Sequence, residues 1–260
     1  MRRKLQNTTS KLLAPALLLT VLLVLWQLCS SMGLVPKFML PAPVDVLFAF
    51  VSEFPVLMQH AAVSLSEAFL GLGAAVLLSF VVACIMDRCA IVRQAVYPLL
   101  ILTQTVPTVA IAPLLVLWLG YGILPKVVLI VITCFFPMTI GLLGGFASAD
   151  PDFIAMMQAM GATPGQIFRY VKLPSSAEQF FSGLRISASY SVVGAVISEW
   201  LGGFEGLGVY MMRVKKSYAF DKMFAVILLI SIISLLLIAA VDLLRKKCMP
   251  WAAQAAQRKF

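Results

Sequence analysis

The sequence predicts an all-α membrane protein with about six transmembrane helices, both termini in the cytoplasm, and a pair of short cytoplasmic helices between spans 4 and 5. Three observations lead to this prediction. Hydrophobic residues make up 62% of the chain and charged residues only 12%, about half the charged share of a soluble domain. Apolar runs long enough to cross a bilayer recur along the chain. One polar segment, "QAMGATPGQIFRYVKLPSSAEQF" at 158–180, interrupts them.

The candidate spans are stretches of roughly 20 apolar residues, the length that a helix needs to cross the hydrocarbon core. They cover 12–34, 62–86, 95–118, 126–147, 183–202 and 223–244. The first follows "MRRK" but is too long for the apolar core of a signal peptide, so we expect a retained helix. The fifth, "SGLRISASYSVVGAVISEWL", is the least apolar of the six.

The basic residues predict the orientation of the chain. Of the 20 lysines and arginines, 14 fall in the termini and in the loops at 87–94 and 148–185, and 6 fall on the other side. This bias places both termini in the cytoplasm, provided that the count of six spans holds. The basic clusters at the chain ends suit anionic lipid headgroups, and we expect no nucleic-acid partner.

The domain organisation follows from the spans. We expect an N-terminal helix and periplasmic segment at 1–60, a transmembrane domain at 61–248 and a basic cytoplasmic tail at 249–260.

The sequence also argues against several kinds of chemistry. None of the five cysteines forms a CxxC pair, and the single histidine, His60, has no obvious ligand partners, so we expect no disulfide framework and no metal site. The chain has no GxxxxGK[ST] loop for ATP phosphates and none of the common HExxH or GxSxG hydrolase motifs. These missing motifs predict that the chain is not an enzyme and holds no cofactor, and that, if ATP energises its function, a separate subunit must hydrolyse it.

The polar segment predicts two short helices joined by a bend. The first covers 152–160, where four apolar residues share one face: Phe153, Met156, Met157 and Met160. Gly161 can end this helix because glycine accepts a left-handed backbone.

The second short helix has a start and a stop in the sequence. Thr163 suits the N-cap, Pro164 the first helical position, and Gln166 completes a capping box. We expect Pro174 to end the helix, because a proline biases the residue before it away from helical backbone. The apolar stripe of this helix consists of Ile167, Phe168 and Val171. The pair of helices is either an interfacial loop on the headgroups or a docking surface for a partner protein.

Here the chain resembles a known family. "GATPGQIFRYVKLPSSAEQFFSGLRIS" resembles the cytoplasmic signature of binding-protein-dependent ABC importer permeases, which begins with Glu-Ala-Ala, continues with a glycine and ends in an Ile-x-Leu-Pro-like run. The matching residues are Gly161, Phe168, Val171, Leu173 and Pro174. The run 155–157 reads Ala-Met-Met where Glu-Ala-Ala is expected, and Glu178 stands where a second proline is common.

The resemblance covers about 60–245. "TQTVPTVAIAPLLVLWLGYG" and "SEWLGGFEGLGVYMM" look like the branch that imports sulfonates, taurine, nitrate and thiamine-precursor pyrimidines, and "SYSVVGAVISEWLGGFEGLG" looks most like the pyrimidine-precursor permeases. The resemblance implies an inner-membrane permease that works with two ATPase subunits, a second permease copy and a periplasmic or lipid-anchored binding protein. It implies a hydroxymethylpyrimidine-like substrate, with sulfonate, taurine, nitrate or another small solute as alternatives. The residues implied to dock the ATPase are Met156, Met157, Gly161, Thr163, Pro164, Gln166, Phe168, Leu173 and Pro174.

A translocation path needs polar or small residues, or irregular backbone, inside the bundle. The candidates are Gln104 and Pro107 in the third span, and Ser187, Tyr190, Ser191 and Glu199 in the fifth. Pro107 and Pro113 should kink the third span. A kinked helix that only packs in the bundle, without lining the path, would show the same prolines. The serines equally suit close helix packing.

Two carboxylates leave further alternatives open. A carboxylate such as Glu199 at membrane depth is usually paired or faces a pore, unless it lies solvated at the interface. Glu67 and Glu199 would be the natural proton or sodium carriers of an ion-coupled secondary transporter. A third alternative is a membrane scaffold protein without a transport role.

Overall fold

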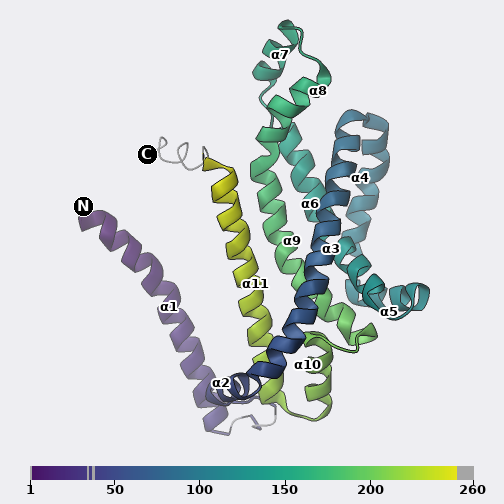
Figure 1. The fold of residues 1–260 in the computed structure, drawn as a ribbon. Coiled ribbons are helices and arrows are strands. Elements are labelled where there is room, and N and C mark those ends of the chain that lie inside the picture. Colours follow the sequence, from purple (N-terminus) through teal and green to yellow (C-terminus); the bar gives the residue numbers. More distant parts are fainter. Residues whose placement is uncertain (1, 34, 37–38, 251–260) are drawn as a thin grey trace. The chain divides into compact units, whose positions relative to one another are not determined.

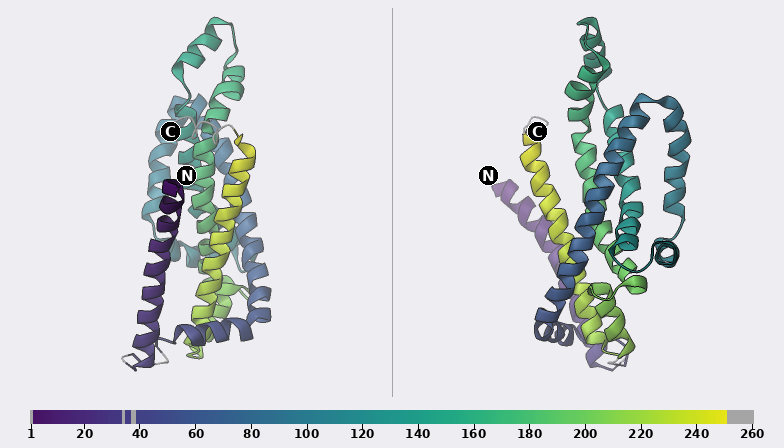
Figure 2. Two further views of the ribbon diagram at one scale, coloured as in Figure 1. Left: turned by 90° about the vertical axis from the view of Figure 1, so that its left-hand side faces the viewer. Right: turned by 45° about the vertical axis from the view of Figure 1, so that its right-hand side comes forward.

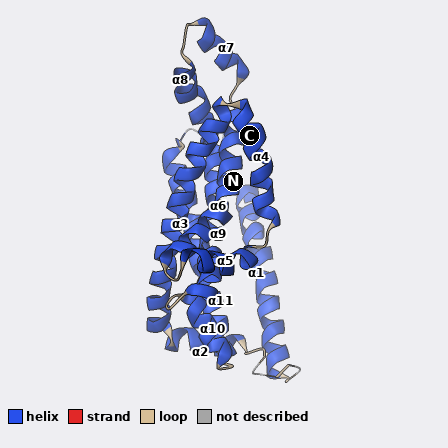
Figure 3. Cartoon of the chain, turned by 90° about the vertical axis from the view of Figure 1, so that its right-hand side faces the viewer, coloured by secondary structure: helices blue, strands red, loops and turns tan. Residues whose placement is uncertain are grey.

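The structure is a computed structural model that describes residues 2–33, 35–36 and 39–250. Within those ranges the secondary structure is helical, without a strand (Figures 1 and 3). Lys37 and most of the basic tail predicted at 249–260 lie outside the described residues. In chain order the helices are α1 (Arg2–Ser31), α2 (Pro43–Ser52), α3 (Phe54–Arg88), α4 (Ala90–Thr105), α5 (Thr108–Leu119), α6 (Ile123–Ala147), α7 (Pro151–Ala159), α8 (Pro164–Ile167), the π-helical turn η1 (Phe168–Lys172), α9 (Leu173–Gly202), α10 (Leu207–Lys216) and α11 (Phe220–Cys248).

Among the described residues, five helical stretches are long and apolar enough to cross a membrane, and counting the α4–α5 pair as one span gives six. The third span predicted at 95–118 corresponds to the α4–α5 pair, and the chain bends there by 103°, at the break where the sequence predicts a kink at Pro107. Val106 has extended backbone, as the residue before a proline prefers, and Pro107 forms the N-cap of α5. Pro113 lies inside α5 and does not break it.

The described chain divides into two compact units. The first combines residues 1–59 with 210–229. Its small core contains Val46, Ala49 and Ala225, and the rings of Trp26 and Phe224 lie 5.6 Å apart between centroids.

The first unit also contains a polar contact among three helices or their ends. Glu53, which follows α2, accepts a hydrogen bond from Lys222 at 2.5 Å and one from Tyr210 at 3.1 Å. Burial and the neighbouring Glu53 carboxylate raise the pKa of Tyr210 to about 12. The phenol is therefore a neutral hydrogen-bond donor at physiological pH.

The second unit comprises 60–209 and 230–260, and α6 and α9 lie side by side through it (Figure 1). Glycines allow this close approach. A Cβ added at Gly145 would come within 2.5 Å of the Cα of Ser176, and one at Gly183 within 2.8 Å of the Pro137 carbonyl oxygen. Gly141 and Gly145 form a GxxxG pair on α6, a pattern typical of close helix packing in membranes, and a Cβ at Gly141 would lie 2.9 Å from the Gln179 carbonyl oxygen.

The polar segment forms α7, a bend and α8, which protrude together beyond α6 and α9 (Figure 1). Gly161 has a φ of +80°, and Thr163 and Gln166 form the predicted capping box. The helix stop predicted at Pro174 is wrong, since the chain stays helical from α8 through η1 into α9. Proline is tolerated because it occupies the first turn of α9, and the Ser175 hydroxyl donates to the Val171 carbonyl at 2.8 Å.

Candidate functional site

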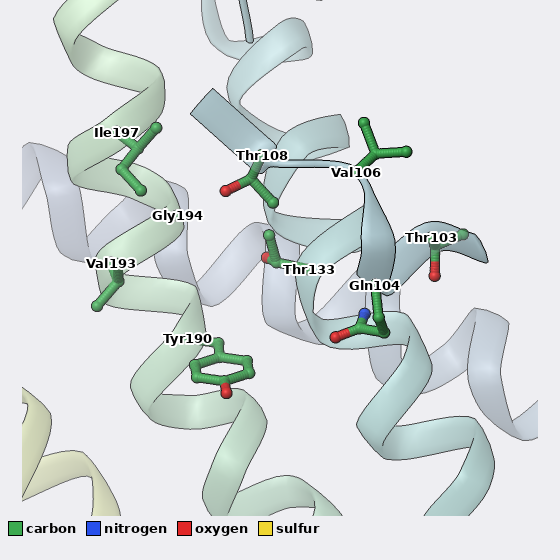
Figure 4. Close-up of a pocket in the computed structure, with 9 residues that line it drawn as sticks. All are labelled: Thr103, Gln104, Val106, Thr108, Thr133, Tyr190, Val193, Gly194 and Ile197. Atoms are coloured by element: carbon green, nitrogen blue, oxygen red, sulfur yellow. The ribbon is translucent and has the colours of Figure 1, made fainter. Parts of the chain in front are cut away.

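A pocket opens where the break between α4 and α5 meets α6 and α9 (Figure 4). Its cavity volume is about 240 Å³. Nine residues line it: Thr103, Gln104, Val106, Thr108, Thr133, Tyr190, Val193, Gly194 and Ile197. None of these nine is charged, and five carry a hydroxyl or an amide group.

The local backbone places these polar groups. Gln104 belongs to the last turn of α4 and Thr108 to the first turn of α5, so the bend brings both to one wall. Thr133 donates its hydroxyl to the Ile130 carbonyl at 2.8 Å, which leaves its oxygen as an acceptor for another molecule. Across the pocket, Tyr190 extends from α9 (Figure 4). The arrangement can hold a small solute by amide and hydroxyl hydrogen bonds and by contact with an aromatic ring.

The structure brings only some of the predicted pathway residues into this pocket. Gln104 and Tyr190 line it, and Pro107 lies between two lining residues in the break itself. Ser187 is buried and donates to the Cys134 carbonyl at 3.1 Å, and Ser191 is buried and donates to its own helix. These two serines therefore contribute to the packing of α9. The threonines around Pro107 and on α6 were missed in the sequence, although "TQTVPT" signals polar side chains at a helix break.

Glu199 lies in a buried polar cluster away from the pocket. Its carboxylate accepts hydrogen bonds from the Ser64 hydroxyl at 2.6 Å and from the Gly208 backbone N–H at 2.5 Å. The same Ser64 oxygen accepts from the Leu207 N–H at 2.8 Å, and His60 Nδ1 accepts from the Gly206 N–H at 3.1 Å. Side chains of α3 and α9 thus satisfy the N–H groups at the start of α10, which have no partner within their own helix.

A second buried pair lies nearby in the same unit. Glu67 of α3 and Lys126 of α6 form an ion pair at 2.5 Å, and both side chains are less than a tenth exposed. The orientation count included Lys126 among the six basic residues on the outer side, but this lysine is buried and paired and is not a loop charge. Within the described ranges, no three His, Cys, Asp or Glu side chains are arranged to hold a metal ion.

The α7–α8 region has one free face and one anchored face. On α7, Phe153, Met156 and Met160 are 57%, 51% and 79% exposed, whereas Met157 is half-buried. The bend and cap residues Gly161, Thr163, Pro164 and Gln166 are also exposed, as is Pro174 at the start of α9.

The anchored face belongs to α8 and η1. The ring of Phe168 packs against that of Phe146 at 5.2 Å between centroids, and the Arg88 guanidinium lies 5.6 Å from the Phe168 centroid. Lys172 pairs with Asp87 at 2.8 Å, and Leu173 packs against the same apolar cluster. Phe168 and Leu173 thus contact the rest of their own unit, and the exposed apolar surface is on α7.

Comparison with known proteins places this fold in a family. The family described as "Binding-protein-dependent transport system inner membrane component" matches residues 75–249. The chain is 35% identical to a probable ABC transporter permease protein of Haemophilus influenzae, over 89% of this chain and 95% of the relative. It is 33% identical to the formylaminopyrimidine transport permease protein ThiX of Halalkalibacterium halodurans, over 92% of this chain and 96% of the relative.

A solved structure supports the fold independently of sequence. A chain from the crystal structure of an amino acid ABC transporter aligns with a TM-score of 0.64 at 15% identity, covering 77% of this chain and 97% of that one. The chain therefore belongs to the family of inner-membrane components of binding-protein-dependent transport systems, the multi-pass permease subunits of ABC importers in the bacterial cytoplasmic membrane, whose ATPase is a separate subunit.

Proposed function

We propose that this permease imports a pyrimidine precursor of thiamine, a hydroxymethylpyrimidine-like solute, and that the pocket at the α4–α5 break is a station on its path. The observation that supports this most is the uncharged, hydrogen-bonding lining of the pocket. A pyrimidine presents ring nitrogens and amino hydrogens, which the Gln104 amide and the threonine oxygens can pair with. Its flat ring can contact Tyr190. The 33% identity to a permease named for formylaminopyrimidine supports the same class.

The alternative substrates are sulfonate, taurine, nitrate or another small solute. An anion of this kind is usually recognised by arginine or lysine, and the nine lining residues include neither. The family match sets aside the ion-coupled transporter and the scaffold protein. Glu67 and Glu199 need no role as ion carriers, because each has a structural partner.

The energy for transport enters, in this proposal, through α7 and α8. Of the two ATPase subunits, one docks on each permease copy at the exposed stripe of Phe153, Met156 and Met160, an apolar helix face suited to a groove in a partner. The bend at Gly161 and the capping box at Thr163 fix the angle between the two short helices.

The continuous helix from α8 to α9 supplies the mechanical link to the pocket. A displacement of α8 passes through η1 into α9 without a flexible loop, and α9 carries Tyr190 and Gly194 to the pocket. Gly194 holds α9 close to α6, since a Cβ there would lie 3.3 Å from the Thr133 hydroxyl. A shift of α9 would therefore change the pocket, which is the two-state element that ATP binding biases.

We further propose a homodimer and a binding protein as partners. Ile186, Tyr190 and Val193 of α9 are 48%, 47% and 44% exposed and follow one helix face. A second copy related by two-fold symmetry would cover this stripe and enclose the path. A periplasmic or lipid-anchored binding protein would deliver the solute, and anionic lipids would contact the basic chain ends.

The substrate is tested by uptake into proteoliposomes that contain the permease, its ATPase and its binding protein. We expect uptake of labelled hydroxymethylpyrimidine to exceed that of taurine, and Gln104→Ala to reduce it. The matched control is Thr105→Ala, an exposed neighbour that does not line the pocket. Preferred uptake of taurine would contradict the substrate while leaving the importer function intact.

Docking is tested by co-purification of the ATPase with variants of α7. Phe153→Asp combined with Met156→Asp should abolish the complex while the permease still inserts. Gln158→Asp, an exposed position on the opposite side of the same helix, should leave the complex intact. An unchanged complex in the double variant would refute the docking surface.

A further inference from the structure

Helix α2 has an apolar face that no described residue covers. Val44, Leu47, Phe48 and Val51 are between 50% and 73% exposed and recur at the i, i+3, i+4, i+7 spacing of one helix face. The other side of the helix is also apolar, since Val46 and Ala49 are buried in the core of the first unit. A short helix with apolar residues on both sides needs a second apolar environment.

The exposed face of α2 also has a polar border. Asp45 and Ser52 are exposed, and the helical period places both on one flank of the apolar stripe. The stripe itself carries no charge. An apolar stripe with a polar edge is the pattern of a helix that lies along a membrane interface.

Hydrogen bonds fix the position of α2 relative to α1, a helix that is long and apolar enough to cross a membrane. The Trp26 indole N–H donates to the Pro41 carbonyl at 3.0 Å, and the Ser30 hydroxyl donates to the Leu40 carbonyl at 3.0 Å. Trp26 precedes the last residue of α1, Ser31, by five positions, which is about 7.5 Å along the helix. The chain therefore enters α2 alongside the last turns of α1, rather than beyond them.

The direction of α2 agrees with this depth. In the left view of Figure 2, α2 runs across the end of α1 instead of continuing along it. Tryptophan is typical of the boundary between headgroups and acyl chains. On the exposed side of α1, Leu25 and Leu28 are 52% and 49% exposed and lie in the last two turns of the helix, so lipid around these turns would also reach the stripe of α2.

We propose that α2 is an interfacial helix whose stripe of Val44, Leu47, Phe48 and Val51 is embedded in the lipid of the leaflet at which α1 ends. Asp45 and Ser52 face the headgroups and water. The periplasmic segment predicted within 1–60 thus includes a membrane anchor. Because Glu53 directly follows α2 and binds both Tyr210 and Lys222, the anchor also holds the connection between α10 and α11 at a fixed depth.

Spin labels on the full-length protein test this proposal. The five native cysteines are replaced, single cysteines are introduced by Phe48→Cys, Val51→Cys and Ser52→Cys, and each is labelled with a nitroxide. The protein is placed in nanodiscs of phosphatidylethanolamine and phosphatidylglycerol, alone and with its ATPase and binding protein. Collisions with oxygen report lipid, and collisions with a water-soluble nickel chelate report water.

We expect the oxygen-to-nickel ratio at 48 and 51 to exceed that at 52 several-fold, with and without the partner proteins. Two positions on the stripe keep the result readable if one variant fails to insert. If the labels at 48, 51 and 52 had equal oxygen-to-nickel ratios and all collided with the nickel chelate, the proposal would be overturned in favour of a water-exposed helix. Exclusion of both reagents at 48 and 51 would overturn it in favour of a protein partner, either a second copy or the binding protein.

Discussion

Replacing Ser64 by alanine should destabilise the protein far more than the loss of a single hydroxyl group suggests. The hydroxyl joins two buried groups, because it donates to Glu199 at 2.6 Å and accepts from the Leu207 N–H at 2.8 Å. Glu199 and Leu207 are 1% and 0% exposed, so water cannot replace the lost bonds. Each orphaned buried group costs about 1–3 kcal/mol, which gives a loss of roughly 2–6 kcal/mol for the Ser64→Ala variant.

Alkylation of the buried Cys134 thiol measures this loss. Cys134 is 0% exposed, so its reaction in native micelles requires the bundle to open, and the other four cysteines are replaced beforehand. A loss of about 2 kcal/mol or more of stability should accelerate alkylation at least about tenfold, since each 1.4 kcal/mol changes the equilibrium constant for opening of the bundle tenfold.

Ser66 provides the matched control on the same helix. It is exposed, and its hydroxyl donates only to the Val63 carbonyl, so Ser66→Ala should change the free energy of unfolding by less than about 0.5 kcal/mol. Equal alkylation rates in Ser64→Ala and Ser66→Ala would show that the cluster at the start of α10 does not depend on the serine bridge.

Two further predictions concern packing and pH. Gly145→Ala should lower the free energy of unfolding by about 1–3 kcal/mol, because the added Cβ meets the backbone of α9. The control Gly144→Ala has open space at its Cβ position and should raise the free energy of unfolding by up to about 1 kcal/mol. Equal thermal midpoints for the two variants would contradict this packing. The hydrogen bond from Lys222 holds the pKa of Glu53 below its ordinary value of 4.5, so the stability from this contact is present above that value and lost as the pH falls through and below it. Thermal midpoints measured from neutral pH into acid should fall less steeply for Glu53→Gln than for the unsubstituted protein. Parallel plots of thermal midpoint against pH for the two proteins would refute the contact.

Much of the fold could be predicted because apolar length and turn chemistry are local signals. The capping box at Thr163 and the left-handed Gly161 depend on a few neighbouring residues, and both are confirmed. The stop at Pro174 was wrong for a physical reason. A proline ends a helix only when its missing N–H and its ring conflict with the preceding turn, and the wider turn of η1 removes that conflict.

The site was harder to predict because it depends on contacts between distant segments. The sequence pointed to Gln104 and Tyr190, but the bend of 103° that brings Thr108 beside them follows from the packing of α5 as well as from Pro107. Glu199 was a pathway candidate because a carboxylate at membrane depth needs a partner. Its partner is Ser64, 135 positions away in the chain, and no sequence pattern links the two.

The docking of the ATPase on α7 is tested most directly by photo-crosslinking in the assembled transporter. A benzophenone amino acid replaces either Phe153 on α7 or Phe204 in the loop after α9, two phenylalanines that are 57% and 78% exposed. They lie beyond opposite ends of the 30-residue helix α9, which is about 45 Å long. We predict a crosslink to the ATPase from position 153 and none from position 204. A crosslink to the ATPase from 204, or its absence at 153, would contradict the account.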